Sequence, residues 1–530
     1  MLFFDLHCHP GLKTLFQLQN GSQVSAWSNL SPHDKLLGDI LESQSSLKML
    51  TQRANINLIC ITLHPPEIGM IDQVLIGLAS LLGYPKVLYG KRLDQMISKE
   101  CSYQETFYQE LENLSAKPRD QDQIADGKQI KFLTSWKDYD QTDVNTLHVV
   151  FNVEGGHTFY DQKNRVRDMN VVLANFDAFL GKKFKVLYFT PTHLTPNEFI
   201  THSYGNKLLS KGNMLPKGIG ITPYGKSFLD HVYKKNILID IKHMSLVSRR
   251  IFYRYRRKYY PSMPIIASHM GFVGNYWKFF SQDVKLPKKK SYGYKVKWVV
   301  GKGVLEDCAF YPLSINLYNE DIREILASKG LIGLSLDLRI LGGKEQVGTE
   351  VKDFYSHEEY ELLTNIDPEQ RIDELFEAME KNQIDNGDTT INLLNPEPPE
   401  MEDIQAARTE MEEMLISTPQ LEKGENYRHH IRLVLNHVLY LYKFTKDEGL
   451  PAPWDNICIG SDFDGLIEAV HCCKNSMDFA DFADGLKSEL AVIEPDFEYP
   501  LGLEISKIVD KIMYSNAFAF LNRHFRNDLE

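Results

Sequence analysis

The sequence predicts an α/β fold: a (β/α)8 barrel of the TIM type that carries large insertions. Short apolar runs rich in β-branched residues recur eight times along the chain, and segments with helical periodicity separate them. Near-continuous apolar strands that alternate with helices are typical of a parallel sheet covered on both faces. Eight such strands favour the closed barrel, and an open, doubly wound sheet is the alternative.

The predicted strands extend from the N-terminus to the last quarter of the chain. They are the runs LFFDLH at 2–7, INLICITLH at 56–64, LHVVFNVEGG at 147–156, FKVLYFTPTHL at 184–194, ILIDIKHMS at 237–245, MPIIASHMG at 263–271, GLIGLSLDLRIL at 330–341 and NICIGSDFDG at 456–465. Segments such as 227–236 and 431–444 are predicted as helices, because their apolar residues recur at the helical period.

Two segments fit no strand or helix of this barrel. Residues 277–312 are rich in lysine and aromatic residues, and 365–426 hold 17 acidic residues against 4 basic ones. A barrel needs only about 250 residues. We therefore interpret both segments as insertions, one basic and aromatic and the other acidic and helical, in a single elaborated domain that spans 1–530. The acidic one is either a solvated surface or an element that binds a partner or covers a site.

Composition and charge narrow the classes of function. The chain of 530 residues has a formal net charge of −12 at pH 7, which disfavours binding to nucleic acids and to membrane surfaces. It contains no apolar run long enough to span a membrane, and its N-terminus lacks the basic region of a signal peptide. Its seven scattered cysteines are expected to be free thiols in a reducing compartment, so we predict a cytoplasmic protein.

Side chains that bind metals or transfer protons stand at the carboxyl ends of most predicted strands: His7, His9, Glu154, His157, His193, His243, His269, Asp462 and Asp464. In a barrel these ends meet at one mouth, where active sites lie. His7 and His9 alternate along one strand and so share a face. One histidine at a strand end is usually structural, but several in register with carboxylates indicate a metal site.

The kinds of ligand indicate which metals this site would hold. Imidazoles and carboxylates without a thiolate cluster suit Zn²⁺, with Mn²⁺ or Fe²⁺ as alternatives. The ligands are too many for one tetrahedral ion, so we expect two divalent ions. Such a pair generates hydroxide near neutral pH and polarises a scissile carbonyl, which is the chemistry of a hydrolase.

Longer motifs are similar to those of one known family. The stretches NVEGGH, YFTPTHLTPNEF, GITPYGKSFLDHVYKKNILIDIKHMS, PIIASHMG, IGSDFDG and SNAFAFLNRHF occur in the family's order. Together they resemble the membrane (renal-type) dipeptidases of the amidohydrolase superfamily. The resemblance implies a metallopeptidase that cleaves the amide bond of dipeptides or dipeptide-like substrates with a metal-bridging hydroxide. Family members often form homodimers, which makes a homodimer an open expectation here.

The resemblance also implies a role for each residue of the site. His7 and His9 would hold one metal ion, His243 and His269 the other, and Glu154 would bridge both. Asp462 would orient the hydroxide and carry its proton to the leaving amine, as a general acid–base group. His193 would stabilise the tetrahedral oxyanion, and His157 and Asp464 would orient the ligands.

Two departures from the family pattern concern the metals and the substrate. The family usually has His-x-Asp where this chain has His7 and His9, so the site loses one negative charge. The family also has an arginine that binds the substrate carboxylate, and Ile315 stands in its place. Arg339 or Lys290 is the candidate to replace it; otherwise Arg339 is an ordinary surface or ion-paired residue.

Other functions remain open at this point. One is an amidohydrolase that acts on a different amide, an ester or a lactone, which would explain the missing arginine. Another is a metal-binding or partner-binding protein without catalysis. The stretch 220–227 formally matches a phosphate-binding loop, but no buried strand precedes it and Pro223 removes a backbone donor, so we do not expect an NTPase.

Overall fold

The computed structural model describes residues 1–15, 17–19, 22–30, 38–53, 55–70, 95, 98, 101–119, 127–161, 166–182, 184–205, 214–290, 293–343, 346–381 and 423–525. Statements about the structure below concern these residues. The acidic insertion predicted at 365–426 lies only partly within them, since 382–422 are outside.

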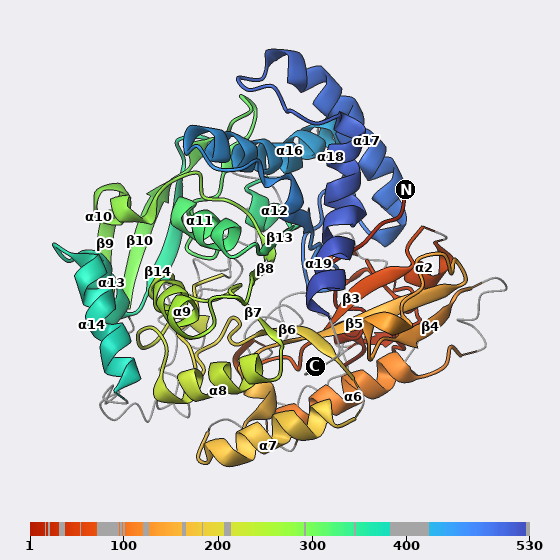
Figure 1. Cartoon of the computed structure of the whole chain (residues 1–530), viewed down its shortest axis with the longest axis horizontal. Helices are drawn as coiled ribbons and strands as arrows, with labels where there is room; N and C mark the ends of the chain where they lie inside the picture. Colours follow the sequence, from red (N-terminus) through yellow and green to blue (C-terminus); the bar gives the residue numbers. More distant parts are fainter. Residues whose placement is uncertain are drawn as a thin grey trace.

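The centre of the fold is a curled parallel sheet (Figure 1). Its order is β15-β13-β8-β7-β6-β5-β3, and β4 pairs with the first half of β5. The strands are β3 (Leu58–Leu63), β4 (Gln129–Phe132), β5 (Thr146–Glu154), β6 (Val186–Thr190), β7 (Leu238–Asp240), β8 (Ile265–Met270), β13 (Leu331–Leu334) and β15 (Ile457–Ile459). Apart from β4 and the first residue of β5 they are buried throughout, as parallel strands covered on both faces must be. Seven of the predicted strands are thereby confirmed, while β4 was not predicted.

The first predicted strand, residues 2–7, lies between the two edges of this sheet. Cys8, which follows it, forms a parallel bridge with Ile61 of β3. The Leu6 amide donates to the Ile459 carbonyl of β15 at 2.9 Å. The N-terminal segment therefore joins the two ends of the strand order.

Several strands end earlier than their apolar runs suggest. Arg339, which was predicted on the seventh strand, lies instead in the short helix α12 (Leu338–Leu341), because the Asp337 side chain accepts from the Arg339 amide and caps that helix. After β7 and β15 the backbone enters the left-handed region at His243 (φ 66°) and Asp462 (φ 65°). A non-glycine residue in that region ends an extended strand.

Helices follow the strands and cover the outside of the sheet (Figure 1). The longer ones are α2 (Leu47–Gln52), α6 (Tyr103–Ser115), α7 (Met169–Leu180), α8 (Pro223–Lys234), α9 (Leu246–Tyr259), α11 (Asn319–Ala327), α16 (Lys423–Asp447), α17 (Phe479–Ile493), α18 (Ile505–Asp510) and α19 (Asn516–His524). Short helices are α1 (Gly38–Leu41), α3 (Ile68–Met70) and α10 (Phe280–Asp283). The helices predicted at 227–236 and 431–444 correspond to α8 and α16.

The start of α8 explains the false match to a phosphate-binding loop. The Thr222 side chain accepts from the Gly225 amide, and Pro223 occupies the first turn, where its missing N–H costs nothing. Ile221 pairs antiparallel with Ile200 rather than ending a buried parallel strand. The stretch is a capped helix start.

The predicted insertions lie beside the central sheet. The basic segment 277–312 contains β9 (Lys285–Lys290) and β10 (Gly293–Val299), which form a three-stranded antiparallel sheet with β14 (Glu350–Tyr355). Helices α13 (His357–Leu363) and α14 (Pro368–Glu380) follow (Figure 1). The acidic residues of α14 pair with the basic face of α9, for example Lys258 Nζ with Glu380 Oε1 at 2.6 Å.

Two further expectations from the sequence concern membranes and thiols. Among the described helices, none combines the length and the apolar character needed to cross a membrane. All seven cysteines are free, and all except Cys101 are buried.

Candidate metal centre

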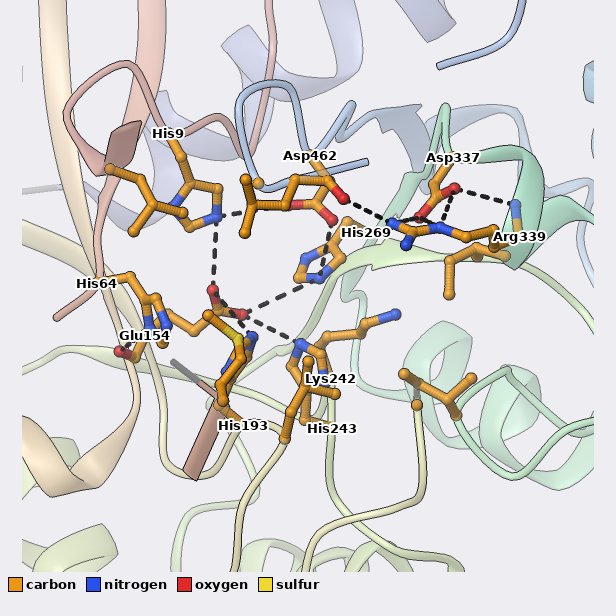
Figure 2. A pocket seen from close by; sticks show the side chains of 18 of the residues that line it. His9, His64, Glu154, His193, Lys242, His243, His269, Asp337, Arg339 and Asp462 are labelled. Carbon is orange, nitrogen blue, oxygen red and sulfur yellow. Dashed lines mark hydrogen bonds and ion pairs between the residues drawn. The ribbon is translucent and has the colours of Figure 1, made fainter. Parts of the chain in front are cut away.

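All seven residues predicted for the site meet at the carboxyl ends of the strands. His7 and His9 come from the N-terminal segment between β3 and β15, and Glu154 is the last residue of β5. His269 lies within β8, while His193, His243 and Asp462 each follow three residues after their strand, in the connections from β6, β7 and β15. Figure 2 shows the Glu154 carboxylate between His9 on one side and His243 on the other.

The two carboxylate oxygens of Glu154 face different imidazoles. Oε2 lies 3.6 Å from His7 Nε2 and 3.5 Å from His9 Nε2. Oε1 lies 3.2 Å from His243 Nε2 and 4.0 Å from His269 Nε2. One buried carboxylate is therefore shared by two pairs of histidines, which is the arrangement of a bridging ligand.

Asp462 completes the cluster on the side away from Glu154. Its Oδ1 is 3.4 Å from His9 Nε2, and its Oδ2 is 4.0 Å from His269 Nε2. The Asp462 side chain is 15% exposed, whereas that of Glu154 is 2% exposed. Both carboxylates line the cavity described below, and Asp462 is the more exposed of the two.

Several buried polar atoms of this cluster lack hydrogen-bond partners among the described residues, which suits the cluster to bind a metal ion. His7 Nε2 and His9 Nε2 lie only 2.9 Å apart, so two imidazoles point at one place. The buried atoms His243 Nε2 and Glu154 Oε1 have no hydrogen-bond partner, although they are 3.2 Å from each other. Buried polar atoms are nearly always satisfied in folded proteins, and convergent imidazole nitrogens and carboxylate oxygens are the donor set of Zn²⁺, Mn²⁺ or Fe²⁺.

Electrostatics keep His243, His269 and Glu154 in the forms that bind metals. Burial holds the pKa of His243 and of His269 well below the ordinary histidine value, so both are neutral imidazoles. For Glu154, burial opposes ionisation, but the charges of His193 and His7 outweigh it and hold its pKa well below the usual range. Burial lowers the pKa of His7, but the charge of Glu154 outweighs it and raises this pKa, so a cation that binds His7 would displace a proton.

Neighbouring side chains fix the orientation of two ligand rings. His7 Nδ1 is 2.7 Å from the Tyr188 hydroxyl, which itself donates to the Leu6 carbonyl. That pattern makes His7 Nδ1 the donor and leaves its Nε2 lone pair facing the cluster. His269 Nδ1 contacts the Ser268 hydroxyl at 2.8 Å. Such outer partners set the tautomer and the direction of a metal-binding histidine.

The EGGH motif is explained by a tight turn after β5. Gly155 has φ 95°, and a Cβ atom at this position would lie 2.2 Å from the ring of His157. The turn therefore requires glycine. It turns the chain away from the sheet directly after Glu154.

His193 is held by a carboxylate that sequence reasoning missed. Its Nδ1 lies 2.5 Å from Glu67 Oε2, and Glu67 also accepts from the backbone and hydroxyl of Thr195. Burial lowers the pKa of His193, but the charges of Glu67 and Glu154 outweigh this and raise it above the ordinary value. His193 Nε2 remains directed towards Glu154 Oε2, 3.9 Å away.

His64 is a second residue that sequence reasoning missed. It follows β3 directly, its Nδ1 is 3.1 Å from the Glu154 carbonyl, and its Nε2 has no partner. Its ring lies 4.3 Å from that of His193 between centroids. The signal was in the sequence, since the run 56–64 also ends in histidine.

The predicted roles of His157 and Asp464 as groups that orient the ligands are not supported by direct contacts. His157 Nε2 is 2.9 Å from the Pro65 carbonyl. Asp464 forms a buried ion pair with Lys13 at 2.8 Å and accepts from the amide and hydroxyl of Ser45. Asp464 thus holds together two loops at the mouth.

A cavity opens from the cluster towards α12. Its polar lining consists mainly of the residues labelled in Figure 2, which are His9, His64, Glu154, His193, Lys242, His243, His269, Asp337, Arg339 and Asp462. Ile315 lies on the same lining, in the place where the family pattern would have arginine. Arg339 reaches the cavity too, whereas Lys290, the other candidate replacement, is on β9 and does not line it.

Two cations on this lining differ in their partners. Arg339 pairs with Asp337 through two nitrogens, at 3.0 Å for Nε and 2.7 Å for Nη2, and it donates to the Leu466 carbonyl. The Lys242 side chain is buried, and its Nζ has no hydrogen-bond partner. Burial lowers the pKa of Lys242 to about 8, against the opposing effect of Asp462 and Glu154.

Comparisons with known proteins give structural matches alone. No family model and no curated protein matches the sequence. The probable dipeptidase PvdM from Pseudomonas aeruginosa matches with a TM-score of 0.49 and 14% identity, over 98% of this chain and 94% of that protein. A metallopeptidase from Rhodobacter sphaeroides, bound to a phosphinate mimic of the dipeptide L-Ala-D-Ala, matches with a TM-score of 0.47 and 11% identity, over 99% of both chains.

An amidohydrolase from Pseudomonas aeruginosa also matches, with a TM-score of 0.43 and 10% identity, over 99% of this chain and 97% of that one. The structural neighbours are thus described as a probable dipeptidase, a metallopeptidase and an amidohydrolase. At these identities and TM-scores, an activity does not carry over from them to this chain.

Proposed function

We propose that this protein is a dinuclear metal-dependent hydrolase that cleaves the amide bond of dipeptides or dipeptide-like substrates. The observation that carries the proposal is the shared carboxylate of Glu154, with each oxygen facing a separate pair of imidazoles. A single tetrahedral site does not need four histidines around one carboxylate.

In this proposal His7 and His9 hold one divalent ion, His243 and His269 hold the other, and Glu154 binds both. Zn²⁺ is the first candidate, with Mn²⁺ or Fe²⁺ as alternatives. When bound, the ions supply an acidified water molecule and polarisation of the scissile carbonyl.

Asp462 and His193 perform the proton transfer and charge stabilisation. The partly exposed carboxylate of Asp462 accepts the proton from the attacking water and delivers it to the leaving amine. Because Glu67 accepts at His193 Nδ1 and keeps the ring protonated, His193 Nε2–H is a donor that faces the reaction site. It stabilises negative charge on the carbonyl oxygen as the tetrahedral species forms.

The closed barrel belongs to the same proposal. The N-terminal segment bonds to β3 on one side and to β15 on the other, so we infer that it serves as the eighth strand of a (β/α)8 barrel. A single elaborated domain, a cytoplasmic location and a homodimer stay predictions from the sequence.

One observation favours a second candidate function. Ile315 lies on the cavity lining where the family pattern has a carboxylate-binding arginine. An amidohydrolase that acts on a neutral amide, an ester or a lactone would not need that arginine. An inactive metal-binding protein is the third candidate, in which Asp462 would act only as a further metal ligand beside His7 and His9.

The test is hydrolysis of a panel of L,L- and L,D-dipeptides by metal-loaded protein. N-acetylated and C-amidated versions are tested in parallel, with the metal-free protein as the blank. Cleavage of free dipeptides supports the proposal. A set of simple esters and lactones is added to the panel. Cleavage of esters, lactones or C-amidated compounds without cleavage of free dipeptides favours the second candidate, and no metal-dependent cleavage of any compound contradicts both.

A further inference from the structure

Lys242 places an ammonium group inside the cavity without giving it a partner. The residue is 1% exposed, and its Nζ makes no hydrogen bond within the described residues. Figure 2 shows its side chain pointing away from Glu154, towards the side of the cavity where Arg339 lies. Burying an unpaired ammonium is unfavourable, and folded proteins seldom contain one without a function.

The carboxylates nearby are engaged elsewhere. Both oxygens of Asp337 accept hydrogen bonds from Arg339. Glu154 and Asp462 face the imidazoles of the metal centre, with His243 and His9 at 3.2 Å and 3.4 Å. Lys242 therefore has three donor hydrogens available for an anion that enters the cavity.

The surroundings of Lys242 indicate the size and kind of that anion. Tyr311, Ile315 and Ile340 line the same cavity and offer mainly apolar surface. The guanidinium of Arg339 is already neutralised by Asp337. A single ammonium in an apolar setting suits one carboxylate on a compact molecule better than a highly charged ligand.

The position of Lys242 in the chain fixes its distance from the reaction site. It immediately precedes His243, and β7 and its turn are buried. An anion bound by Lys242 is thus held at a set separation from the atoms around Glu154. This is what a dipeptidase requires, because the carboxylate of its substrate lies a fixed number of bonds from the scissile amide.

We propose that Lys242 binds the free carboxylate of the substrate and replaces the arginine that is absent at Ile315. The substrate class is then a small amide with a carboxylate close to the scissile bond, and Arg339 is a structural ion-paired residue. This inference rests on the proposed function for its kinetic test, whereas its binding test does not.

The kinetic test compares wild type with Lys242→Met and Lys242→Arg, all metal-loaded, on Ala-Ala and on Ala-Ala amide. Loss of a charge-assisted contact should raise KM for Ala-Ala about 10- to 100-fold in Lys242→Met, with kcat changed much less. Lys242→Arg should recover part of this loss. Lys117→Met, which removes an exposed lysine after α6, is the matched control and should behave as wild type.

The specific readout is the ratio of kcat/KM for the free dipeptide to that for its amide. We expect Lys242→Met to bring this ratio close to one while its metal content stays equal to that of wild type. A ratio unchanged from wild type in Lys242→Met would overturn the inference, even if the dipeptidase activity itself were established.

The binding test works without turnover. Titration calorimetry of the metal-loaded protein compares N-acetylglycine with N-acetylglycinamide. Wild type should bind the carboxylate more tightly, and Lys242→Met should show no preference. If wild type prefers neither compound, or if the variant keeps the preference, the inference is wrong whatever the hydrolysis panel shows.

Discussion

The two sides of the cavity differ in how their charges are satisfied. On the metal side, four histidines surround the carboxylate of Glu154, and the outer nitrogens of two of them, His7 and His269, contact the hydroxyls of Tyr188 and Ser268. On the opposite side, the amino group of Lys242 has no hydrogen-bond partner in the part of the chain that the structure describes, and Ile315 offers only apolar surface. In the proposed function, the first side holds the metal ions and the second receives the substrate.

This difference shows why the metal ligands and the substrate contacts of the proposed hydrolase can vary independently. A metal site needs several ligands in one geometry, so a change in any ligand is costly. A carboxylate can be bound by any cation that reaches it, so the family arginine can be lost if Lys242 reaches the same space. The reaction type and the substrate preference are therefore separate claims that need separate experiments.

The largest effect is expected from a change at Asp462 that should lower the rate of the reaction without lowering the metal content. Asp462→Asn removes the proton acceptor while keeping the size of the side chain, so kcat should fall about 100- to 10,000-fold. Metal content, measured by elemental analysis, should stay at the wild-type level. A kcat near that of wild type would show that Asp462 does not carry the proton.

The metal side was largely predictable because its residues follow strands. His7, His9, Glu154, His243 and His269 each end an apolar run or follow it closely, and parallel strands bring those ends together. Glu67 was not predictable. It comes from the loop after β3, contacts a residue 126 positions away, and no local pattern marks that pairing.

The opposite side was harder to predict because it depends on turns. Lys242 belongs to the run ILIDIKHMS, where the sequence indicates only a polar residue at the end of a strand. Nothing in the sequence indicates that its amino group lies inside the cavity. Arg339 was placed on a strand because the run 330–341 is apolar, but the cap at Asp337 starts a helix there. Strand bounds near the site are set by caps and left-handed residues, which apolar patterns do not reveal.

A smaller effect is expected when a side chain that orients a metal ligand is changed. Tyr188→Phe removes the hydroxyl that orients His7, so metal affinity should fall about 10- to 100-fold, measured by competition with a chelator. Tyr233→Phe is the matched control, because the Tyr233 hydroxyl is buried without a partner. Equal affinities in both variants would show that the hydroxyl of Tyr188 does not orient the ligand.

The smallest effect concerns the pair of Glu67 and His193 in the metal-free protein. The pKa of His193 is raised above 6.5 and that of Glu67 is held well below 4.5, so the stabilisation is complete only between about pH 4.5 and pH 6.5. It is lost as the pH rises through the raised pKa of His193 and as it falls through the lowered pKa of Glu67.

Glu67→Gln should therefore lower the free energy of unfolding by about 1–3 kcal/mol at pH 5.5, and by less at pH 9. Urea titrations at the two pH values measure this difference. A loss that is equal at both pH values would mean that the pair acts as a neutral hydrogen bond.

The most direct test of the central claim is the number of metal ions bound by wild type and by Glu154→Gln. Elemental analysis after equilibration with Zn²⁺ should give two ions per chain for wild type. The variant, which lacks the charge shared by the two pairs of histidines, should retain at most one tightly held ion. One ion per chain in wild type, or two tightly held ions in Glu154→Gln, would contradict the bridged dinuclear centre.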